Sequence, residues 1–217
     1  METFCPDVQP LADAPIVAFD FDGTLTCRDS FMAFLRWRAG PIGFALGLIR
    51  LMPATLAYAV HRDRGRLKVA AARVFLEGLT ADALIVSARA FATAEGARLL
   101  RPDAVRRWRE WRDQGARLLI VTASPEIIIS PFAEDLGAFA IIGTRLATRD
   151  GRLTGAFDGA NCRGAEKVVQ LRAAFGPKVR LAAAYGDTGG DREMLAIADA
   201  PGYRVFKEKP ALDRSIF

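Results

Sequence analysis

The segment IVAFDFDGTLTCRDS, residues 16 to 30, places an almost uninterrupted apolar run directly before two acidic residues. A run of this kind is typical of a strand that is covered on both faces, as in parallel sheets. We expect a strand over 16–21, with Asp20 and Asp22 at its end and Gly23 in the turn that follows. Residues two apart in a strand point to the same side, so both carboxyl groups should face one crevice.

The rest of the chain alternates between helical and strand patterns. Residues 29 to 98 are almost wholly helical in pattern, with breaks expected near Gly40, Gly65 and Gly78. After residue 102, helices and strands alternate, which predicts an α/β fold with a parallel sheet and helices on both faces. The expected helices are 31–38, 42–60, 65–77, 81–97, 103–113, 125–136, 164–175 and 190–199, and the later strands are 117–122, 138–144, 179–185 and 203–206.

Local signals refine this assignment. Asp150 and Gly151 are typical of the turn of a β-hairpin. Ser124 as N-cap and Pro125 at the first helical position would begin the helix 125–136. Trp108 and Trp111 fall on one face of the helix 103–113, together with Ala104, which favours a place in the core over a role in stacking on nucleic-acid bases.

Composition limits the possible classes of function. A chain of 217 residues suits one main core with a smaller lobe, and an excess of 30 Lys and Arg over 25 Asp and Glu selects no particular partner. Cys5, Cys27 and Cys162 form no metal-binding spacing, which favours free thiols in a reducing compartment, and the N-terminus lacks the pattern of a signal peptide. The protein is therefore expected in the cytoplasm. A single histidine, His61, argues against most His-dependent catalytic triads.

Polar groups follow three of the expected strands. Thr122, Ala123 and Ser124 come after the second strand, and Asp187 and Asp191 lie in GDTGGD after a later one. In addition, CRGAEK places Lys167 at the start of a helix. Ligands of open parallel sheets bind beyond the carboxyl ends of the strands, so these groups should meet Asp20 and Asp22 in one site.

Four carboxylates in one crevice repel one another unless a cation neutralises them. Mg²⁺ does this with oxygen ligands while keeping room for a substrate phosphate. A phosphate would then lie among the metal, Lys167, the Thr122 hydroxyl and the backbone N–H groups near Ala123 and Gly23. One acid could attack phosphorus while another exchanges protons with the leaving alcohol and with water. No P-loop motif is present in the sequence, so a P-loop nucleotide enzyme is not indicated.

The motifs DFDGTLT, VTAS, CRGAEK and YGDTGGDREML, in this order, make the chain resemble the haloacid dehalogenase (HAD) superfamily of Mg²⁺-dependent phosphatases, and within it subfamily IB, the phosphoserine-phosphatase-like branch. The resemblance implies a Rossmann-like doubly wound core, made of 1–28 and 99–217, and an inserted helical cap, 29–98. It implies Asp20 as nucleophile and Asp22 as general acid/base. Mg²⁺ would be held by Asp20, the Asp22 main-chain carbonyl and Asp187, with Asp191 close by.

The resemblance also bears on the substrate. Asp29 takes the place of a Glu, and Arg73 that of an Arg, that grip the amino-acid end of the substrate in phosphoserine phosphatases. The shorter acid, with Ala123 and Ser124 in place of two glycines, is more similar to the phosphatidylglycerophosphatase C-type subgroup. The expected substrate is a small phosphorylated metabolite or a lipid head-group phosphate. Phosphoserine or histidinol phosphate hydrolysis, phosphotransfer to another acceptor, and a basic binding module without catalysis are the alternatives; nucleic acid is not expected as a partner.

The segment 41–60, PIGFALGLIRLMPATLAYAV, approaches a membrane span in length and apolar character, but Arg50 and Pro53 interrupt it. We expect two short helices broken near Pro53 instead of a span. The segment is either the core of the cap or an apolar face that contacts a membrane surface, where Arg50, Arg62 and Arg64 would suit the headgroup region.

Overall fold

The computed structural model describes residues 14–61 and 64–211, and within this range the side chains of residues 57–64 are not described. The expectations for the N-terminal segment and Cys5, and for the side chains of His61, Arg62 and Arg64, therefore lie outside the described part of the chain.

A six-stranded sheet forms the centre of the molecule, in the order β4-β3-β2-β1-β5-β6. The strands are β1 (Ile16–Phe19), β2 (Arg117–Pro125), β3 (Ala140–Arg149), β4 (Arg152–Asp158), β5 (Leu181–Gly186) and β6 (Ala198–Tyr203). All neighbouring pairs are parallel except β3 and β4, which form the hairpin predicted at Asp150 and Gly151. From β1, the strands β2, β3 and β4 follow on one side and β5 and β6 on the other. The carboxyl end of β1 therefore lies where the direction of the strand order changes, which is where a ligand site is expected in such sheets.

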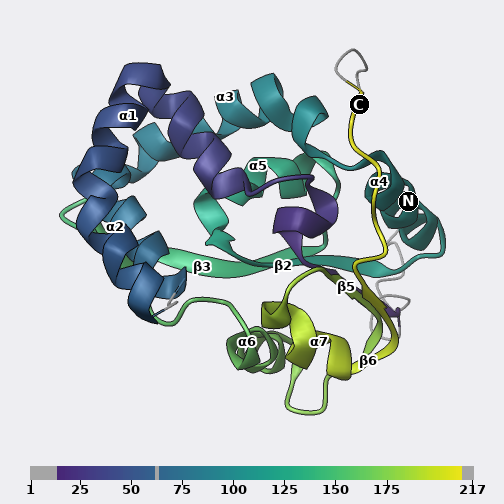
Figure 1. The fold of residues 1–217 in the computed structure, drawn as a ribbon. Coiled ribbons are helices and arrows are strands. Elements are labelled where there is room, and N and C mark those ends of the chain that lie inside the picture. Colours follow the sequence, from purple (N-terminus) through teal and green to yellow (C-terminus); the bar gives the residue numbers. More distant parts are fainter. Residues whose placement is uncertain (1–13, 62–63, 212–217) are drawn as a thin grey trace, which may run out of the picture.

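Helices cover both faces of this sheet (Figure 1). They are α1 (Ser30–His61), α2 (Arg64–Leu76), α3 (Ala81–Leu99), α4 (Pro102–Asp113), α5 (Glu126–Asp135), α6 (Ala165–Phe175) and α7 (Arg192–Ala196). In Figure 1, α4 and α5 lie on one side of the sheet and α6 and α7 on the other, while α1 and α2 form a lobe beside α3. The predicted α/β fold with a largely parallel sheet is thus confirmed. The division into core and cap at residues 29 and 98 stays a prediction.

The two faces of the sheet have separate apolar cores. On one face, Phe19 of β1 packs on the fully buried Trp108 of α4, with ring centroids 5.0 Å apart. On the other, Ala18 belongs to a smaller cluster with Leu171 of α6 and Met194 of α7. Alternate residues of β1 thus enter different cores, which explains why its sequence is apolar without a break. The strand that carries the site is therefore held from both sides.

The lobe made by α1 and α2 differs from the expectation. The predicted break near Pro53 is wrong, because Pro53 lies inside α1; the helix changes direction at Gly40, where φ is 68°. Pro41 follows directly, at the start of the helical part after the bend. A backbone N–H at this position would have no acceptor within the helix, so proline, which has no N–H, is tolerated there. The break expected near Gly65 agrees with the structure, since α1 ends at His61 and α2 begins at Arg64. Gly78, with φ 81°, does follow the end of α2 as expected.

Boundaries at two other places were predicted incorrectly. The last strand is Ala198–Tyr203 instead of 203–206, and the helix predicted over 190–199 is limited to Arg192–Ala196. The segment ADAPGY has few β-branched residues, but it pairs with the buried strand β5, so tertiary context overrides its local preference. Similarly, β1 ends at Phe19, because the next residue begins the turn that shapes the site.

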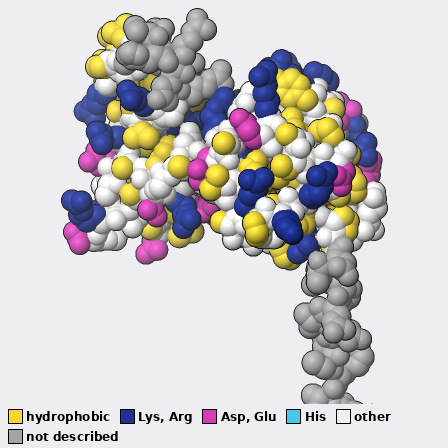
Figure 2. Space-filling model, turned by 90° about the horizontal axis from the view of Figure 1, so that it is seen from below, with side chains coloured by type: hydrophobic (Ala, Val, Ile, Leu, Met, Phe, Trp, Pro, Cys, Tyr) yellow, Lys and Arg dark blue, Asp and Glu magenta, His cyan; other side chains and the backbone are white. Residues whose placement is uncertain are grey.

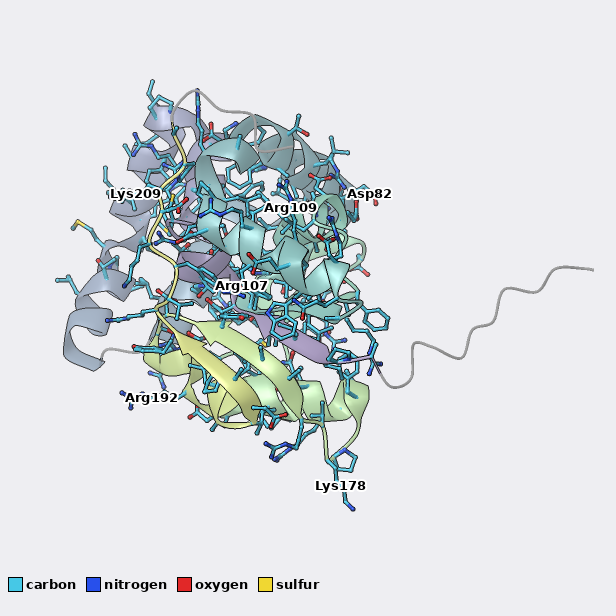
Figure 3. The ribbon with its side chains drawn as sticks, turned by 90° about the vertical axis from the view of Figure 1, so that its right-hand side faces the viewer. Asp82, Arg107, Arg109, Lys178, Arg192 and Lys209 are labelled. Atoms are coloured by element: carbon cyan, nitrogen blue, oxygen red, sulfur yellow. The ribbon has the colours of Figure 1, made fainter. Side chains whose placement is uncertain are left out.

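Charged side chains are distributed over many elements. Figure 2 shows Lys and Arg spread among hydrophobic side chains on the face that it presents. Figure 3 labels examples on separate elements: Asp82 on α3, Arg107 and Arg109 on α4, Lys178 between α6 and β5, Arg192 on α7, and Lys209 in the C-terminal segment. Neither view shows a single continuous basic block.

Candidate active site

The turn after β1 brings its acidic residues into the site. Asp20 is extended, and residues Phe21–Leu25 then curl into one tight turn in which Gly23 has φ 87°. Only glycine adopts this conformation at little cost. A Cβ on Gly23 would also overlap the Asp187 carboxylate, so the absence of a side chain lets the turn approach the end of β5. The DGT sequence therefore makes possible the meeting of acids from two strands.

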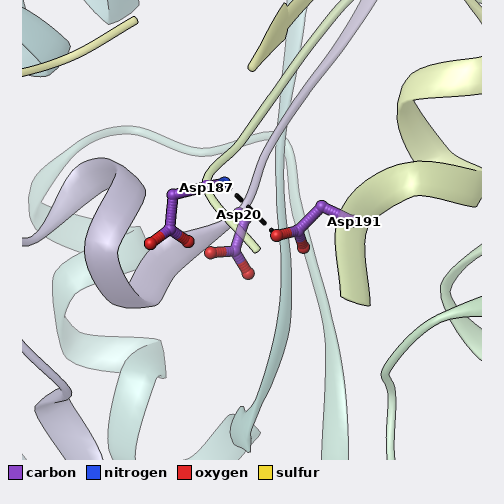
Figure 4. A group of neighbouring side chains, drawn as sticks. All are labelled: Asp20, Asp187 and Asp191. Atoms are coloured by element: carbon purple, nitrogen blue, oxygen red, sulfur yellow. Dashed lines mark hydrogen bonds between the residues drawn. The ribbon is translucent and has the colours of Figure 1, made fainter. Parts of the chain in front are cut away.

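Three carboxyl groups point toward one another at this place (Figure 4). Asp20 follows β1, Asp187 follows β5, and Asp191 precedes α7; one oxygen of each lies within 4.8 Å of the others. Within the described residues, this group could hold a metal ion. The prediction that these three acids converge agrees with the structure, whereas their individual roles stay predictions.

The two acids near β5 have different surroundings. Asp191 Oδ2 accepts hydrogen bonds from Thr188 N and Thr188 Oγ1, both at 2.9 Å, and from Asp187 N at 3.3 Å. Its Oδ1 accepts one from Lys167 at 2.7 Å. Asp187 Oδ1, by contrast, is buried and has no hydrogen-bond partner among the described residues. Such an atom needs a donor or a cation, so Asp187 has a free coordination position that Asp191 lacks.

Lys167 connects the parts of the site. Its ammonium group is buried and donates hydrogen bonds to Asp20 Oδ1 at 2.6 Å and to the Val121 carbonyl at 2.6 Å, in addition to Asp191. A buried ammonium is stable only when charge and hydrogen bonding compensate for lost hydration. Burial acts to lower the pKa of Lys167, but Asp20 and Asp191 outweigh it and raise the pKa, so this lysine stays charged.

The same surroundings shift the pKa values of the three acids in different directions. Burial raises the pKa of Asp20 to about 7, with Lys167 acting to lower it and Asp191 to raise it further. Burial also raises the pKa of Asp187, and Asp191 adds to this effect. For Asp191, burial is opposed by Lys167 and the Thr188 donors, so its pKa is lowered. A cation beside Asp20 and Asp187 would favour their charged forms, which is the condition that a metal site provides.

Asp22 lies between the sheet and the first turn of α1. Its Oδ1 accepts from Ser30 N at 2.7 Å and from Ser30 Oγ at 2.5 Å, and its Oδ2 accepts from the Ser124 hydroxyl. Lys68 of α2 lies 3.9 Å from Oδ2 and 3.2 Å from Ser124 Oγ. The predicted role of Ser124 as a helix N-cap is wrong, because Ser124 belongs to β2 and its hydroxyl binds Asp22; α5 begins only at Glu126.

A cavity of about 250 Å³ opens over these groups. Its lining includes nearly all of the predicted site residues and five that sequence reasoning missed, one of which is Gly190. The predicted ones are Asp20, Asp22, Gly23, Asp29, Ala123, Lys167, Asp187 and Asp191, and the missed ones that carry side chains able to bind an anion or hydrogen-bond are Lys68, Asn161, Arg163 and Thr188. Arg163 lies inside the quoted CRGAEK motif and Asn161 directly precedes it, so the signal was present, whereas no local pattern singled out Lys68.

Thr122 and Arg73 do not line this cavity. Thr122 is buried beneath it, where its hydroxyl accepts a hydrogen bond from Ser124 N at 3.0 Å. Arg73 lies on α2 with its backbone against Gly155 of β4, and lines a neighbouring cavity that also includes Asn161. The assignments of Thr122 to phosphate and of Arg73 to substrate stay predictions. Lys68 is the α2 cation that the structure brings to the acids.

Asp29 has a structural contact besides its place in the cavity. Its Oδ1 accepts a hydrogen bond from Met32 N at 2.8 Å, as a helix N-cap does. Partial loss of solvation raises the pKa of Asp29, the Asp22 carboxylate raises it further, and Lys68 acts in the opposite direction. Asp29 therefore both lines the cavity and caps the first turn of α1, and its assignment to the substrate stays a prediction.

Comparison with known proteins agrees with this geometry. Residues 17–196 match the family model of haloacid dehalogenase-like hydrolases, which covers most of the chain. The chain belongs to this family. Within it, the chain is 60% identical over 197 residues to the protein CicA of Caulobacter vibrioides, covering 90% of this chain and 88% of CicA. It is also 32% identical over 206 residues to a phosphoserine phosphatase of Halobacterium salinarum, covering 91% and 88% of the two chains.

Solved structures of other proteins share the fold. A protein of unknown function from Bordetella pertussis Tohama I has a TM-score of 0.72 at 23% identity, covering 87% of this chain and 88% of that one. A phosphoserine phosphatase with a phospho-aspartyl intermediate analogue has a TM-score of 0.58 at 20% identity, covering 87% and 85%. At such identities the similarity supports the fold alone.

Proposed function

We propose that this chain is a Mg²⁺-dependent phosphomonoester hydrolase that works through an aspartyl-phosphate intermediate. The observation that supports this most directly is the pairing of a buried nucleophile candidate, Asp20, with a buried cation, Lys167, beside the unpartnered oxygen of Asp187. Family membership and the relative named phosphoserine phosphatase favour the same chemistry. Mg²⁺, when bound, would offset the negative charge of the acids and of the phosphate.

Asp20 Oδ1 accepts a hydrogen bond from Lys167, whereas among the described residues the one side-chain contact of Oδ2 is with the Thr24 hydroxyl, at 3.3 Å. Oδ2 is therefore the oxygen that would attack phosphorus, forming a new O–P bond as the bond to the leaving alcohol breaks. Asp22 would donate a proton to that alcohol, then remove one from the water that cleaves the aspartyl phosphate. Its two serine contacts hold the carboxyl group in place for both steps.

In the phosphate-bound state, Lys167 and the backbone near Gly23 and Ala123 would stabilise the phosphoryl oxygens, with Thr122 contributing if it turns from its contact with Ser124. Asp20, the Asp22 carbonyl and Asp187 would hold the metal, and Asp191 would position Lys167 and the turn at Thr188. The donor set is all oxygen, which suits Mg²⁺.

The substrate that we propose is a small phosphorylated metabolite or a lipid head-group phosphate such as phosphatidylglycerophosphate, as in the phosphatidylglycerophosphatase C-type subgroup of subfamily IB. Asp29 and Lys68 at the cavity favour a substrate with further charged groups. Activity against phosphatidylglycerophosphate micelles, phosphoserine and histidinol phosphate separates these possibilities. Absence of turnover of the lipid would exclude the first.

The experiment that tests the mechanism compares Asp20→Asn with Asp22→Asn. With p-nitrophenyl phosphate, whose leaving group needs no proton, Asp22→Asn should still form the phosphoenzyme but hydrolyse it slowly, so one phosphoryl group per chain should accumulate. Asp20→Asn should form none and should lose Mg²⁺-dependent phosphate release while keeping its circular dichroism spectrum. Full activity of Asp20→Asn would refute the mechanism.

The unmodified protein and Asp20→Asn also test two alternative functions. If the intermediate passes its phosphoryl group to an acceptor other than water, added alcohols should reduce free phosphate without slowing substrate loss. If the chain is instead a basic binding module, it should bind nucleic acid or membranes in a salt-sensitive way that survives Asp20→Asn, and should release no phosphate.

A further inference from the structure

The part of α1 after Gly40 exposes an apolar face that the proposed chemistry does not use. The α1 apolar face consists of Ile42, Leu46, Ile49, Met52 and Leu56, each between 55% and 76% exposed. Their spacing of three or four residues places them on one side of the helix. Single exposed apolar residues are common, whereas a continuous row of five marks a surface that contacts something.

The opposite side of this helix already has its partner. Gly47 and Leu51 are buried there, and Gly47 lies so close to Phe75 of α2 that a Cβ would overlap the ring. Phe44 stacks on the same ring, with centroids 5.6 Å apart. The helix is therefore fixed to the rest of the lobe by this side, which leaves the α1 apolar face pointing to solvent.

Charge distinguishes this lobe from the remainder of the chain. Together α1 and α2 contain seven Lys and Arg and no Asp or Glu. Removing those seven from the 30 Lys and Arg of the chain leaves fewer of them than the 25 Asp and Glu. The basic excess of the protein thus belongs to the two helices that carry the α1 apolar face. Arg50, which is exposed, follows Ile49 directly.

The helix is suited to lie on a membrane and not to cross it. Ser30–Leu56 is long and apolar enough for a span by length and composition, and only 11% of its apolar window is buried. However, it bends at Gly40, and the charged Arg50 lies near the middle of the part that follows, where a membrane span would place it in the hydrocarbon core. Its other side also packs on α2, so lipid could not surround it.

We propose that the α1 apolar face docks on an anionic lipid bilayer, with Ile42, Leu46 and Ile49 entering the boundary between headgroups and acyl chains. The basic residues of α1 and α2 would add long-range attraction to anionic headgroups. The alternative occupant is a second copy of this chain. It is less favoured, because two lobes of the same sign would repel each other.

The test is sedimentation with vesicles of phosphatidylcholine alone and of phosphatidylcholine mixed with phosphatidylglycerol. The unmodified chain should bind the mixed vesicles much more tightly, and high salt should weaken the binding. Leu46→Glu and Ile49→Glu should each weaken it at least about tenfold, because each removes an apolar side chain that docking would bury in the bilayer. Arg50→Gln should weaken it about fivefold.

Ile85→Glu is the matched control, since Ile85 is an exposed apolar residue on α3. It should bind as the unmodified chain does. Hydrolysis of p-nitrophenyl phosphate in solution should be equal in all four variants, which separates a failure of docking from a failure of the proposed catalysis. Lack of binding to phosphatidylglycerol vesicles, or equal binding by Leu46→Glu and the unmodified chain, would overturn the proposal. So would a dimer that Ile49→Glu dissociates in the absence of vesicle binding.

Discussion

The ammonium group of Lys167 lies 2.6 Å from Asp20 Oδ1, and both side chains are buried. This pair joins the first turn of α6 to the end of β1, two segments separated by most of the chain. A buried charge that loses its partner is strongly destabilising, more so than the intact pair is stabilising. Loss of either partner is therefore expected to lower the stability of the fold, besides affecting the proposed chemistry.

Lys167→Met should lower the free energy of unfolding by about 3–5 kcal/mol in the presence of EDTA, because Asp20 and Asp191 would remain buried without their shared cation. Urea denaturation measures this change. Lys68→Met is the control, because Lys68 lines the same cavity but is less buried, and its loss should cost less than about 1 kcal/mol. Equal losses would contradict the importance assigned to burial.

Asp187→Asn should abolish most of the stabilisation that Mg²⁺ gives against thermal unfolding, since the oxygen without a hydrogen-bond partner is the one free to bind a cation. Asp191→Asn should weaken the Mg²⁺ response by a smaller factor, about 10-fold, because its oxygens are already engaged. Thermal scans across a magnesium titration would compare them. If Asp191→Asn lost more of the Mg²⁺ response than Asp187→Asn, the assignment of Asp187 as the metal ligand would be wrong.

Gly23→Ala should weaken the response to Mg²⁺ and reduce phosphate release, because the new methyl group would overlap the Asp187 carboxylate. It should also cost about 1–3 kcal/mol of stability from its positive φ. Gly78→Ala shares the positive φ but has open space around it, so it should lose stability alone. An unchanged magnesium response in Gly23→Ala would contradict the close approach.

Lys68→Met should reduce the activity on the best substrate found by screening about tenfold, chiefly through KM, because it removes a cation from the cavity. Arg73→Met, which alters a neighbouring cavity, should have a smaller effect. Steady-state kinetics of both variants would decide between them. If Arg73→Met is the more damaged, the substrate extends past Asn161 into the neighbouring cavity that Arg73 lines.

Cys162 should resist alkylation by iodoacetamide at pH 8 in the folded protein. Burial raises the pKa of its thiol to about 12, so the reactive thiolate is nearly absent there and grows only as the pH approaches that value. Mass spectrometry of peptides after labelling would measure this. In denaturant the same residue should react readily, and rapid labelling of the folded chain would contradict its burial.

A feature could be predicted from the sequence when it follows from a local pattern, and could not when it depends on how distant segments pack. The meeting of Asp20, Lys167 and Asp187 follows from their positions at strand ends and at a helix start, because a parallel sheet brings such ends to one edge. Lys68 could not be found in this way, since its place depends on how α2 packs against β4 and α1. A single side chain that reaches the site from a helix of another lobe produces no recognisable pattern in the sequence.

The errors at Ser124 and the last strand have a similar cause. Each residue was interpreted by its local preference, and each is governed by a contact far away in sequence. Ser124 binds Asp22 across 102 positions, and Ala198–Tyr203 forms a strand because β5 offers an open edge. Local chemistry predicts turns such as Asp150-Gly151 well, because there the two residues themselves determine the conformation.

Ser30 is both the first residue of α1 and the double donor to Asp22. The point where the helical lobe departs from the sheet is thus also the point that orients the proposed proton carrier. Any swing of the lobe at Ser30 would pull on that carboxyl group first. Substrate access and proton transfer would then be coupled. Opening of the lobe would displace the carboxyl group of Asp22, and closing of the lobe would restore its position for proton transfer.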